Sequence, residues 1–481
     1  MALQYDAAVS KADFTAALAN NTNISSSTTA AISSVLGLDA ISSLVVAGWN
    51  GTGSVVAPVG LAPDVLIINP ADGANLALPT GTEITPVIVI DSKSGEDVAL
   101  TIGAPAPSAT ARLAADASTS ATAAVSATAS TDTAIAKVVV GGNGNDTITY
   151  VGSANVQLDG GAGDDTLTSG KGNDVIIAGT GTNTVDAGAG NDTIVVGKGI
   201  DTVNAGTGFD TIDVAGNSTG FTATAAGNAL VLTGAAGISA TVTNAEFVTF
   251  ADGHNLAIVG TEEEAQALSL YSVLLGRDVD AGGAANFTAQ VQSGTSVAEI
   301  AQSFLTSDEH YTNLRADFLN DVYSSLLDRA TDATGVATWQ SQFEAGATRG
   351  DVFNAIASSD EAGNLSDADF ISALYSAALG RDAEEAGLNN WVSLLASGTS
   401  RTEVADTIFA STEAVTKNNT EFVDSLFDNA LGNDANELAK DFAVKALDGG
   451  SVTQADVVIA VIGQPEAQDH ISNVIVVPGA V

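Results

Sequence analysis

Glycine and aliphatic positions repeat every nine residues between 141 and 213, and only Tyr150 interrupts the register. Each well-formed block has glycine at places two and four, Asp or Asn at place six, and Ile, Leu or Val at place eight. Glycine permits a tight turn at positive φ, and the short strand that follows points one aliphatic side chain inward. Two blocks make one coil of eighteen residues. The pattern predicts a central parallel β-roll, a right-handed β-solenoid, within a multidomain α+β chain.

Stacked coils would align the sixth-place side chains in two columns. Because stacked carboxylates repel one another, we expect a hard cation between them, bound by carboxylate oxygens and glycine-turn carbonyls, with about three to five Ca²⁺ ions per chain. Val156 removes the first carboxylate of one column, and Asn183 offers an oxygen without charge, so the sites that share Asn183 should be weaker. The predicted sixth-place ligands are Asp146, Asp165, Asn183 and Asp201 in one column, and Asp174, Asp192 and Asp210 in the other. The predicted turn ligands are Gly142, Gly144, Gly161, Gly163, Gly170, Gly172, Gly179, Gly181, Gly188, Gly190, Gly197, Gly199, Gly206 and Gly208.

Different patterns flank these blocks on the N-terminal side and immediately after them. Residues 1–103 begin with apolar positions at helical spacing and continue with short β-type runs between turn residues, which predicts a helical and then a β segment. The Ala/Ser/Thr-rich stretch 104–135 is either a linker or a small-residue extension of the solenoid. Apolar runs between 229 and 259 predict strands that close the end of the roll, which then spans 136–260.

A second repeat, with a period of 52 residues, fills 261–473. The first three units share a constant spacing of Tyr, Arg and a later Phe or Trp, followed by a Ser/Gly turn, a Ser or Thr cap and an amphipathic run. The fourth unit has Phe427 at the Tyr position, loses the Arg (Asn433) and the Trp, and slips by one residue. We therefore predict an all-α array of about four units, each with three short helices around an aromatic core. The units are 261–313, 314–364, 365–418 and 419–473, and a tail follows at 474–481. The aligned positions are Tyr271, Tyr323 and Tyr375, then Arg277, Arg329 and Arg381, then Phe287, Trp339 and Trp391.

Two features of this array allow more than one interpretation. The pairs Arg277–Asp278 and Arg381–Asp382 favour a helix cap with a local ion pair over a ligand site. A further calcium at Asp278 and Asp280 is disfavoured, because Ala330 replaces the first aspartate in the second unit. The apolar C-terminal tail is the last element of the fourth unit, an export signal, or an edge that pairs with a neighbouring molecule.

The net negative charge of the chain limits the classes of partner that it can bind. It has 57 acidic and 15 basic residues, and a net charge of −42. Such a chain lacks the clustered Lys and Arg that nucleic acid needs, and an anionic membrane surface would repel it, whereas a divalent cation is a natural partner. There is no cysteine, so disulfides and thiolate metal sites are excluded. The N-terminus does not resemble a cleavable signal peptide, and no apolar run reaches the length of a transmembrane span.

Catalytic patterns are weak. His254, His310 and His470 lie far apart and form no zinc-protease motif. A G-x-S-x-G pattern around Ser218 lacks the strand and helix that a nucleophile elbow requires. Carboxylates cluster in the nonapeptide blocks, where calcium would occupy them, which disfavours paired acid–base catalysis. We therefore predict that the protein is not an enzyme.

Residues 141–213 resemble the RTX repeats of bacterial proteins exported by type I secretion, and the phrase EFVTFADG at 246–253 resembles the segment that commonly follows RTX arrays. This resemblance implies an extracellular protein with an uncleaved C-terminal export signal. The "LLGRD" phrases of the 52-residue units are similar to a helical repeat found beside RTX arrays in secreted and surface-layer proteins, and to phycobilisome linkers.

These observations together predict a secreted, calcium-binding structural protein of the bacterial cell surface or extracellular matrix, comparable to an S-layer, fibre or adhesin component. Calcium would trigger folding outside the cell and self-association into an extracellular assembly. The main alternative is a soluble secreted protein that binds a ligand such as a cell-surface glycan through its helical units. An RTX hydrolase is the less favoured alternative.

Overall fold

The computed structural model describes residues 8–19, 24–57, 62–70, 73–79, 82, 85–91, 97–103, 134–432 and 436–479. The predicted linker or extension, 104–135, lies outside these residues except at its last two positions. Contacts divide the chain into two compact units. The first comprises Met1–Glu262, Asp280–Ala285 and Val474–Val481, and the second comprises Glu263–Val279 and Asn286–Asn473.

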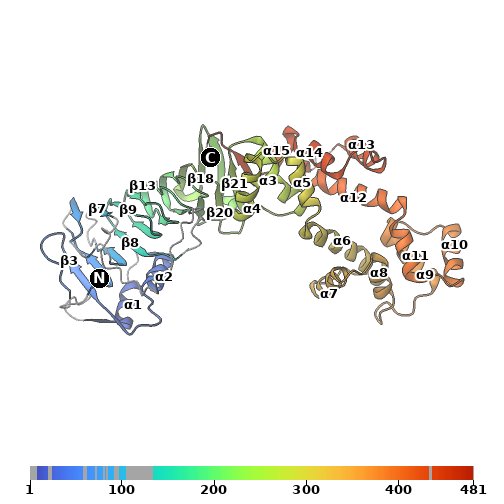
Figure 1. Cartoon of the computed structure of the whole chain (residues 1–481), viewed down its shortest axis with the longest axis horizontal. Coiled ribbons are helices and arrows are strands. Elements are labelled where there is room, and N and C mark those ends of the chain that lie inside the picture. Colours follow the sequence, from blue (N-terminus) through green and yellow to red (C-terminus); the bar gives the residue numbers. More distant parts are fainter. Residues whose placement is uncertain are drawn as a thin grey trace, which may run out of the picture. The chain divides into compact units, whose positions relative to one another are not determined.

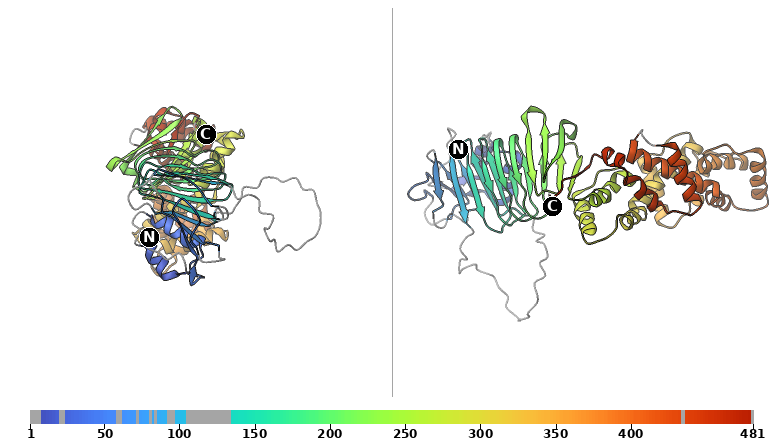
Figure 2. Two further views of the ribbon diagram at one scale, coloured as in Figure 1. Left: turned by 90° about the vertical axis from the view of Figure 1, so that its left-hand side faces the viewer. Right: turned by 90° about the horizontal axis from the view of Figure 1, so that it is seen from above.

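The first unit is built on two sheets whose strands alternate along the chain (Figures 1 and 2). Within the described residues the first sheet has eleven strands, in the spatial order β3 (Val46–Trp49), β4 (Val65–Ile68), β6 (Val87–Ile90), β8 (Lys137–Gly142), β10 (Val156–Gly161), β12 (Val175–Ile177), β14 (Thr193–Val196), β16 (Thr211–Val214), β20 (Phe247–Phe250), β21 (Asn255–Val259) and β22 (Val474–Val476). The second sheet has nine, in the order β5 (Ala74–Ala77), β7 (Val98–Gly103), β9 (Thr147–Val151), β11 (Thr166–Thr168), β13 (Thr180–Asp186), β15 (Lys198–Asn204), β19 (Ser239–Thr243), β18 (Ala229–Gly234) and β17 (Phe221–Ala226). The central strands are parallel, so this part of the chain is β-roll-like.

Eighth-place aliphatic side chains fill the space between the sheets. Leu158, Ile176 and Ile194 of the first sheet, and Leu167 and Val185 of the second, are at most 1% exposed. The parallel register pairs the eighth-place residue of one block with the eighth-place residue of the block in the next coil, for example Leu158 with Ile176. Each such side chain stabilises the fold by about 1.5–3 kcal/mol relative to exposure. This apolar stack is what holds the glycine turns and their sixth-place residues in line.

The N-terminal strands continue the same two sheets. Strand β6 pairs with β8 through Val87 and Val138, and β7 pairs with β9 through Leu100 and Ile148. The predicted N-terminal segment and the predicted roll thus share their sheets and one core. Strands such as β4 are buried on both faces, because helices α1 (Lys11–Ala19) and α2 (Ser26–Val35) contribute Phe14 and Ile32 to a second apolar cluster with the outward side chains.

The C-terminal end of the roll changes direction. Strand β20 still pairs in parallel with β16, but β21 turns back antiparallel to β20. In the other sheet β17, β18 and β19 form an antiparallel meander. The chain's last strand, β22, pairs in parallel with β21, with Val474 opposite Ala257. Residues Val474–Val476 of the C-terminal tail are therefore a strand of the first sheet.

The 52-residue repeats form a helical region (Figure 1). Capping boxes begin the third helix of each unit at Ser296, Thr348, Ser400 and Thr453, where the cap and an acidic residue three positions later satisfy each other's backbone N–H. The extra residue before Thr453 is the slip seen in the fourth repeat. The helices are α3 (Glu262–Leu275), α4 (Ala281–Gln292) and α5 (Val297–Leu305); α6 (Asp308–Leu327), α7 (Ala333–Glu344) and α8 (Arg349–Ala357); α9 (Asp367–Leu379), α10 (Glu385–Ala396) and α11 (Arg401–Phe409); α12 (Thr412–Leu431), α13 (Glu437–Asp448) and α14 (Gln454–Ile462); and α15 (Pro465–His470).

The repeated arginines bind a different partner from the predicted neighbour. Arg277 pairs through Nε with Glu309 at 2.6 Å, and its Nη1 donates to the backbone carbonyl of Asp278. Its guanidinium also lies 4.7 Å from the centre of the Tyr271 ring. The second and third units repeat this arrangement with the pairs Arg329–Glu361 and Arg381–Glu413. Each arginine therefore connects the segment just after the first helix of its unit to a glutamate 32 residues later in the chain.

Candidate metal centre: two carboxylate columns in the roll

The strand register stacks the sixth-place residues as the nine-residue pattern predicts. Thr166 pairs with Thr147 and with Thr184, so the residues just before them, Asp165, Asp146 and Asn183, follow one another in one column. Asn183 then pairs directly with Asp201. In the other column Val156, Asp174, Asp192 and Asp210 stack in the same way, because the residues that follow them, Gln157, Val175, Thr193 and Thr211, pair in register.

Each sixth-place side chain binds the backbone of the coil before it. The N–H of Asp146 donates to Asp165 Oδ1 at 2.8 Å, and the N–H of Asp165 donates to Asn183 Oδ1 at 2.9 Å. The N–H groups of Asp174 and Asp192 donate to the next carboxylate, at 2.7 and 2.8 Å. One oxygen of each rung is therefore committed to the ladder, and the second is left for another partner.

The second carboxylate oxygen is buried without a partner among the described residues in three of the sixth-place residues, whereas in Asp146, Asp174 and Asp201 it accepts a glycine N–H. Asp165 Oδ2, Asp192 Oδ2 and Asp210 Oδ2 accept no hydrogen bond from the described residues, although these residues are at most 1% exposed. Burying an unpaired carboxylate is costly, and desolvation accordingly raises the pKa of Asp146 to about 6, of Asp165 and Asp192 to about 7, and of Asp210 to about 8. Without a cation, burial shifts these carboxyl groups toward the protonated form.

The glycine turns pack their backbones directly on one another. A Cβ on Gly163 would lie 2.2 Å from the carbonyl oxygen of Gly144, and one on Gly181 would lie 2.0 Å from that of Gly163. A Cβ on Gly160 would meet both Asp165 Oδ2, at 2.5 Å, and the carbonyl oxygen of Ala178, at 2.7 Å. Carboxylate and carbonyl oxygens thus converge at places that only glycine leaves open.

This donor set fits a calcium ion. It consists of carboxylate, amide and backbone carbonyl oxygens, which are the ligands of hard cations, and offers neither thiolate nor imidazole. In the described part of the chain, no three acidic, His or Cys side chains converge as a metal cluster. The reason is that each coil supplies one sixth-place side chain to each column, so a bound ion would take carboxylates from adjacent coils and complete its shell with turn carbonyls. When bound, calcium would supply the positive charge that the buried oxygens lack.

Asn183 replaces part of that charge with a hydrogen bond. Its side-chain amide donates to Asp201 Oδ1 at 2.9 Å, and Asp201 Oδ2 accepts the N–H of Gly197 at 3.0 Å, so neutral N–H groups occupy both oxygens of that carboxylate. Val156 puts a buried apolar side chain at the sixth place of its block. Its contact with Asp174 is made by its backbone N–H, which donates to Asp174 Oδ1 at 2.8 Å. These two positions interrupt the columns, each in its own way.

A second ladder, at place five, was missed by the sequence interpretation. Asn145 Oδ1 accepts the N–H of Asp164 at 2.6 Å, and Asp164 Oδ1 accepts the N–H of Thr182 at 2.7 Å. In the other column Asn155, Asn173 and Asn191 do the same for the coils that follow them. These side chains bind forward along the roll, whereas the sixth-place side chains bind backward. Five of the eight blocks have Asn or Asp here, which was the available signal.

Replacing one turn glycine should destabilise the roll strongly. Gly190 has φ +133° and a Cβ there would lie 2.0 Å from the carbonyl oxygen of Gly172, so we expect Gly190→Ala to cost about 3 kcal/mol or more. Gly227→Ala is the matched control, because Gly227 has φ +67° but no atom lies within 4 Å of the place its methyl group would take, and should cost about 1 kcal/mol. Urea unfolding of the calcium-loaded chain measures both. Equal losses would contradict close backbone stacking.

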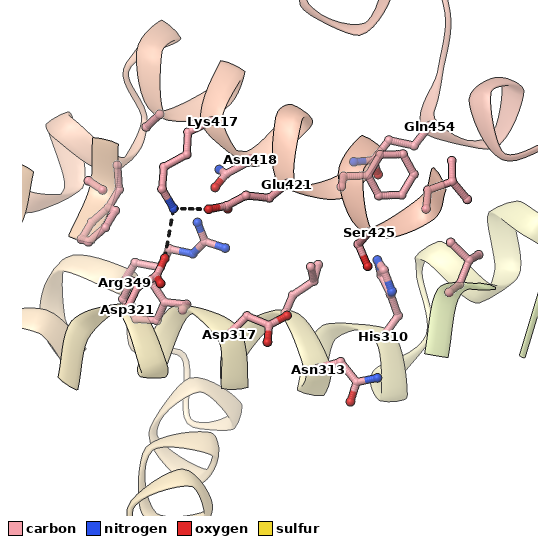
Figure 3. A pocket seen from close by; sticks show the side chains of 18 of the residues that line it. His310, Asn313, Asp317, Asp321, Arg349, Lys417, Asn418, Glu421, Ser425 and Gln454 are labelled. Atoms are coloured by element: carbon pink, nitrogen blue, oxygen red, sulfur yellow. Dashed lines mark hydrogen bonds and ion pairs between the residues drawn. The ribbon is translucent and has the colours of Figure 1, made fainter. Parts of the chain in front are cut away.

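The helical region contains a separate cavity of about 480 Å³ (Figure 3). It is lined by matching positions of α6 and α12, 104 residues apart: Asn313 with Lys417, Asp317 with Glu421, and Asp321 with Ser425. Lys417 pairs with Asp321 at 3.0 Å and with Glu421 at 2.5 Å. Also on its wall, His310 is 6% exposed and its Nδ1 has no partner among the described residues.

Comparison with known proteins assigns both repeat systems. The RTX calcium-binding nonapeptide repeat (4 copies) matches residues 138–149, 159–194 and 195–214, and a domain of unknown function, DUF4214, matches 257–314, 310–365 and 362–418. Curated proteins give no match. Among solved structures, the extracellular lipase LipA from Serratia marcescens is similar at 16% identity and a TM-score of 0.18, over 22% of this chain and 19% of the lipase chain. Residues 138–214 are therefore RTX calcium-binding nonapeptide repeats, which bind Ca²⁺ and indicate a secreted protein, and DUF4214 domains follow them.

Proposed function

We propose that the protein is a secreted, calcium-dependent structural protein of the cell surface or extracellular matrix, as in an S-layer, fibre or adhesin. The observation that carries this proposal is the pair of buried carboxylate columns, whose free oxygens lack a positive partner among the described residues. A ligand that binds only the folded state stabilises that state by mass action. Calcium therefore acts on the fold itself.

The same charge makes calcium a condition for assembly. A net charge of −42 causes self-repulsion, which bound calcium reduces. Helix α13 offers an apolar contact for self-association, because Leu438 is 78% and Phe442 is 75% exposed, one helical turn apart. Outside the cell calcium is on the order of 10⁻³ M, within the range of extracellular calcium modules. None of the described helices is long and apolar enough to cross a membrane.

Electron microscopy of the purified chain tests the structural role. We expect sheets or filaments to form with calcium at about 10⁻³ M and to disperse when a chelator is added. The double variant Leu438→Ser/Phe442→Ser should bind calcium normally but assemble less, because only the apolar contact is removed. A wild-type chain that remains monomeric at high concentration with calcium would contradict the structural proposal.

A soluble sugar-binding protein is the second candidate, favoured by the cavity between α6 and α12. Its volume falls in the range of small-molecule sites, and its wall combines hydrogen-bonding groups such as Asn313 and Asn418 with the aromatic ring of Phe318. Titration with neutral mono- and disaccharides, followed by calorimetry, tests it. Asp317→Ala should abolish binding, and Asp360→Ala, outside the cavity lining, should not.

A further inference from the structure

We propose that the second carboxylate column does not end with the last nonapeptide: Glu246 is its final rung, and Asp210 and Glu246 hold a divalent cation at the C-terminal end of the roll. This inference rests on the proposed calcium dependence and adds a site outside the nonapeptide repeats. Glu246 lies 36 residues after Asp210 and beyond the matched RTX segment, which ends at 214.

The strand register puts Glu246 at the sixth place of one more coil. Strand β14 pairs with β16 through Thr193 and Thr211, and β16 pairs with β20 through Thr211 and Phe247. The residues immediately before these three are Asp192, Asp210 and Glu246. The meander of β17, β18 and β19 lies between Asp210 and Glu246 in the sequence. Glu246 therefore does not continue the nine-residue repeat, although it still stacks on Asp210.

The hydrogen-bond ladder continues to Glu246 without a change of pattern. The N–H of Asp174 donates to Asp192, and that of Asp192 donates to Asp210, at 2.7 and 2.8 Å. The N–H of Asp210 donates to Glu246 Oε2 at 2.6 Å. The backbone N–H of Glu246 in turn donates to the carbonyl of Asp210, at 3.1 Å. Glu246 therefore accepts a backbone N–H from the coil before it, as aspartate does in the earlier coils, through a side chain that is one methylene longer.

The pair also lacks a positive charge. Asp210 is 0% and Glu246 8% exposed, and Asp210 Oδ2 has no hydrogen-bond partner among the described residues. Within the same part of the chain, no Lys, Arg or His pairs with either carboxylate. Two adjacent buried carboxylates are stable together only when a cation or a proton compensates them. Because all the donors in reach are oxygens, a hard divalent cation such as Ca²⁺ fits better than a transition metal.

The carbonyls of the last glycine turn are available to complete such a site. In earlier coils the carbonyls of Gly170 and Gly188 accept the N–H of Ala189 and Thr207 in the next coil. The carbonyl of Gly206, the equivalent glycine of the last block, accepts no such bond from the described residues. The roll thus ends in a turn whose oxygens are not consumed by a following glycine turn.

Calorimetric titration of the metal-free full-length chain with Ca²⁺ tests the site through its stoichiometry. Glu246→Gln keeps an oxygen that can accept the N–H of Asp210, so the fold is retained, and it should bind one ion fewer than wild type. Asp186→Asn is the matched control: Asp186 is an exposed carboxylate of the roll that accepts a hydrogen bond from Asn204, and its loss should leave the stoichiometry unchanged. Circular dichroism of each variant in the presence of Ca²⁺ verifies folding.

The outcomes separate the site from the proposed function. A stoichiometry in Glu246→Gln equal to wild type would overturn the terminal site alone, as would an equal loss in Asp186→Asn. If the wild-type chain bound no Ca²⁺, the proposed function would fail together with the site. Glu246→Ala should lose the same ion as Glu246→Gln, and retention of that ion in either variant would also refute the assignment.

Discussion

Metal-free protein is expected to lose the structure of the roll as the pH rises from 5 to 8, and Ca²⁺ is expected to restore it. Burial raises the pKa of Asp165 and Asp192 to about 7 and that of Asp210 to about 8 in the folded chain, against about 4 in an unfolded one. The folded state therefore holds more protons than the unfolded state between these values, and stability falls as the pH rises through the folded pKa values.

The size of this effect is large relative to the stability of a domain. Each carboxyl group that is protonated in the folded chain but ionised in the unfolded chain lowers the free energy of unfolding by about 1.4 kcal/mol per pH unit. A pKa difference of about three units therefore lowers it by about 4 kcal/mol for one carboxyl group. Asp165 and Asp192 are both 1% exposed, so solvent screening weakens this little. Two or three such groups equal the 5–15 kcal/mol that usually stabilises a domain. Calcium competes with the protons and supplies the missing charge at high pH.

Hydrogen exchange measured by mass spectrometry distinguishes the roll from the helices in the intact chain. In calcium-free buffer, peptides from 141–213 should be protected at pH 5 and should exchange as unfolded chain at pH 8, after correction for intrinsic rates. Peptides from 308–431 serve as the internal control, because their fold contains no sixth-place carboxylates. Protection of the roll that is unchanged or higher at pH 8 without calcium would contradict the sign of the prediction.

Asp192→Ala is expected to weaken calcium binding far more than Asn183→Ala. Asp192 lies between Asp174 and Asp210 in its column, accepts the N–H of the first and has an Oδ2 with no partner among the described residues. Its removal takes a charged ligand from two adjacent sites, so affinity should fall by roughly tenfold or more. Asn183 has no charge and already uses its amide on Asp201, so its loss should matter less.

Two further substitutions separate charge from hydrogen bonding at these positions. Asp192→Asn keeps the acceptor for the Asp174 N–H but removes the charge, so it should lower calcium affinity while making the metal-free roll more stable. Asn183→Asp adds a carboxylate next to Asp201 and should do the reverse. Calorimetry and thermal unfolding with and without calcium measure both effects. Equal effects of Asp192→Ala and Asn183→Ala would refute the column model.

Several features of the candidate site follow from covalent spacing alone. An eighteen-residue coil places every second block above the first, so the columns of Asp146 and Asp174 can be derived without any knowledge of packing. The breaks at Val156 and Asn183 follow from the same count. The 52-residue period likewise indicated three helices per unit, because caps and apolar positions are local signals.

Other features depend on contacts between segments far apart in the sequence, which local patterns do not encode. Strands β4 to β7 carry no nonapeptide, yet Leu100 pairs with Ile148 in the same sheet. Arg277 pairs with Glu309, whose repeat at Glu361 and Glu413 is visible only once the partner is known. The tail strand β22 pairs with β21, more than two hundred residues earlier in the chain.

The sequence by itself therefore determined the repeat lengths, the sixth-place columns, the oxygen-only ligand set and the calcium-binding character of the nonapeptides, because each follows from a fixed period or from side-chain chemistry. Only the tertiary structure decided where the roll begins and ends, which carboxylate follows Asp210, and which helices enclose the cavity. Those outcomes arise from strand register and helix packing, where an apolar surface is buried by whichever segment fits it, whatever its distance along the chain. Glu246 shows the difference most clearly: its spacing from Asp210 breaks the nine-residue rule, and its place in the column is fixed by the pairing of β16 with β20.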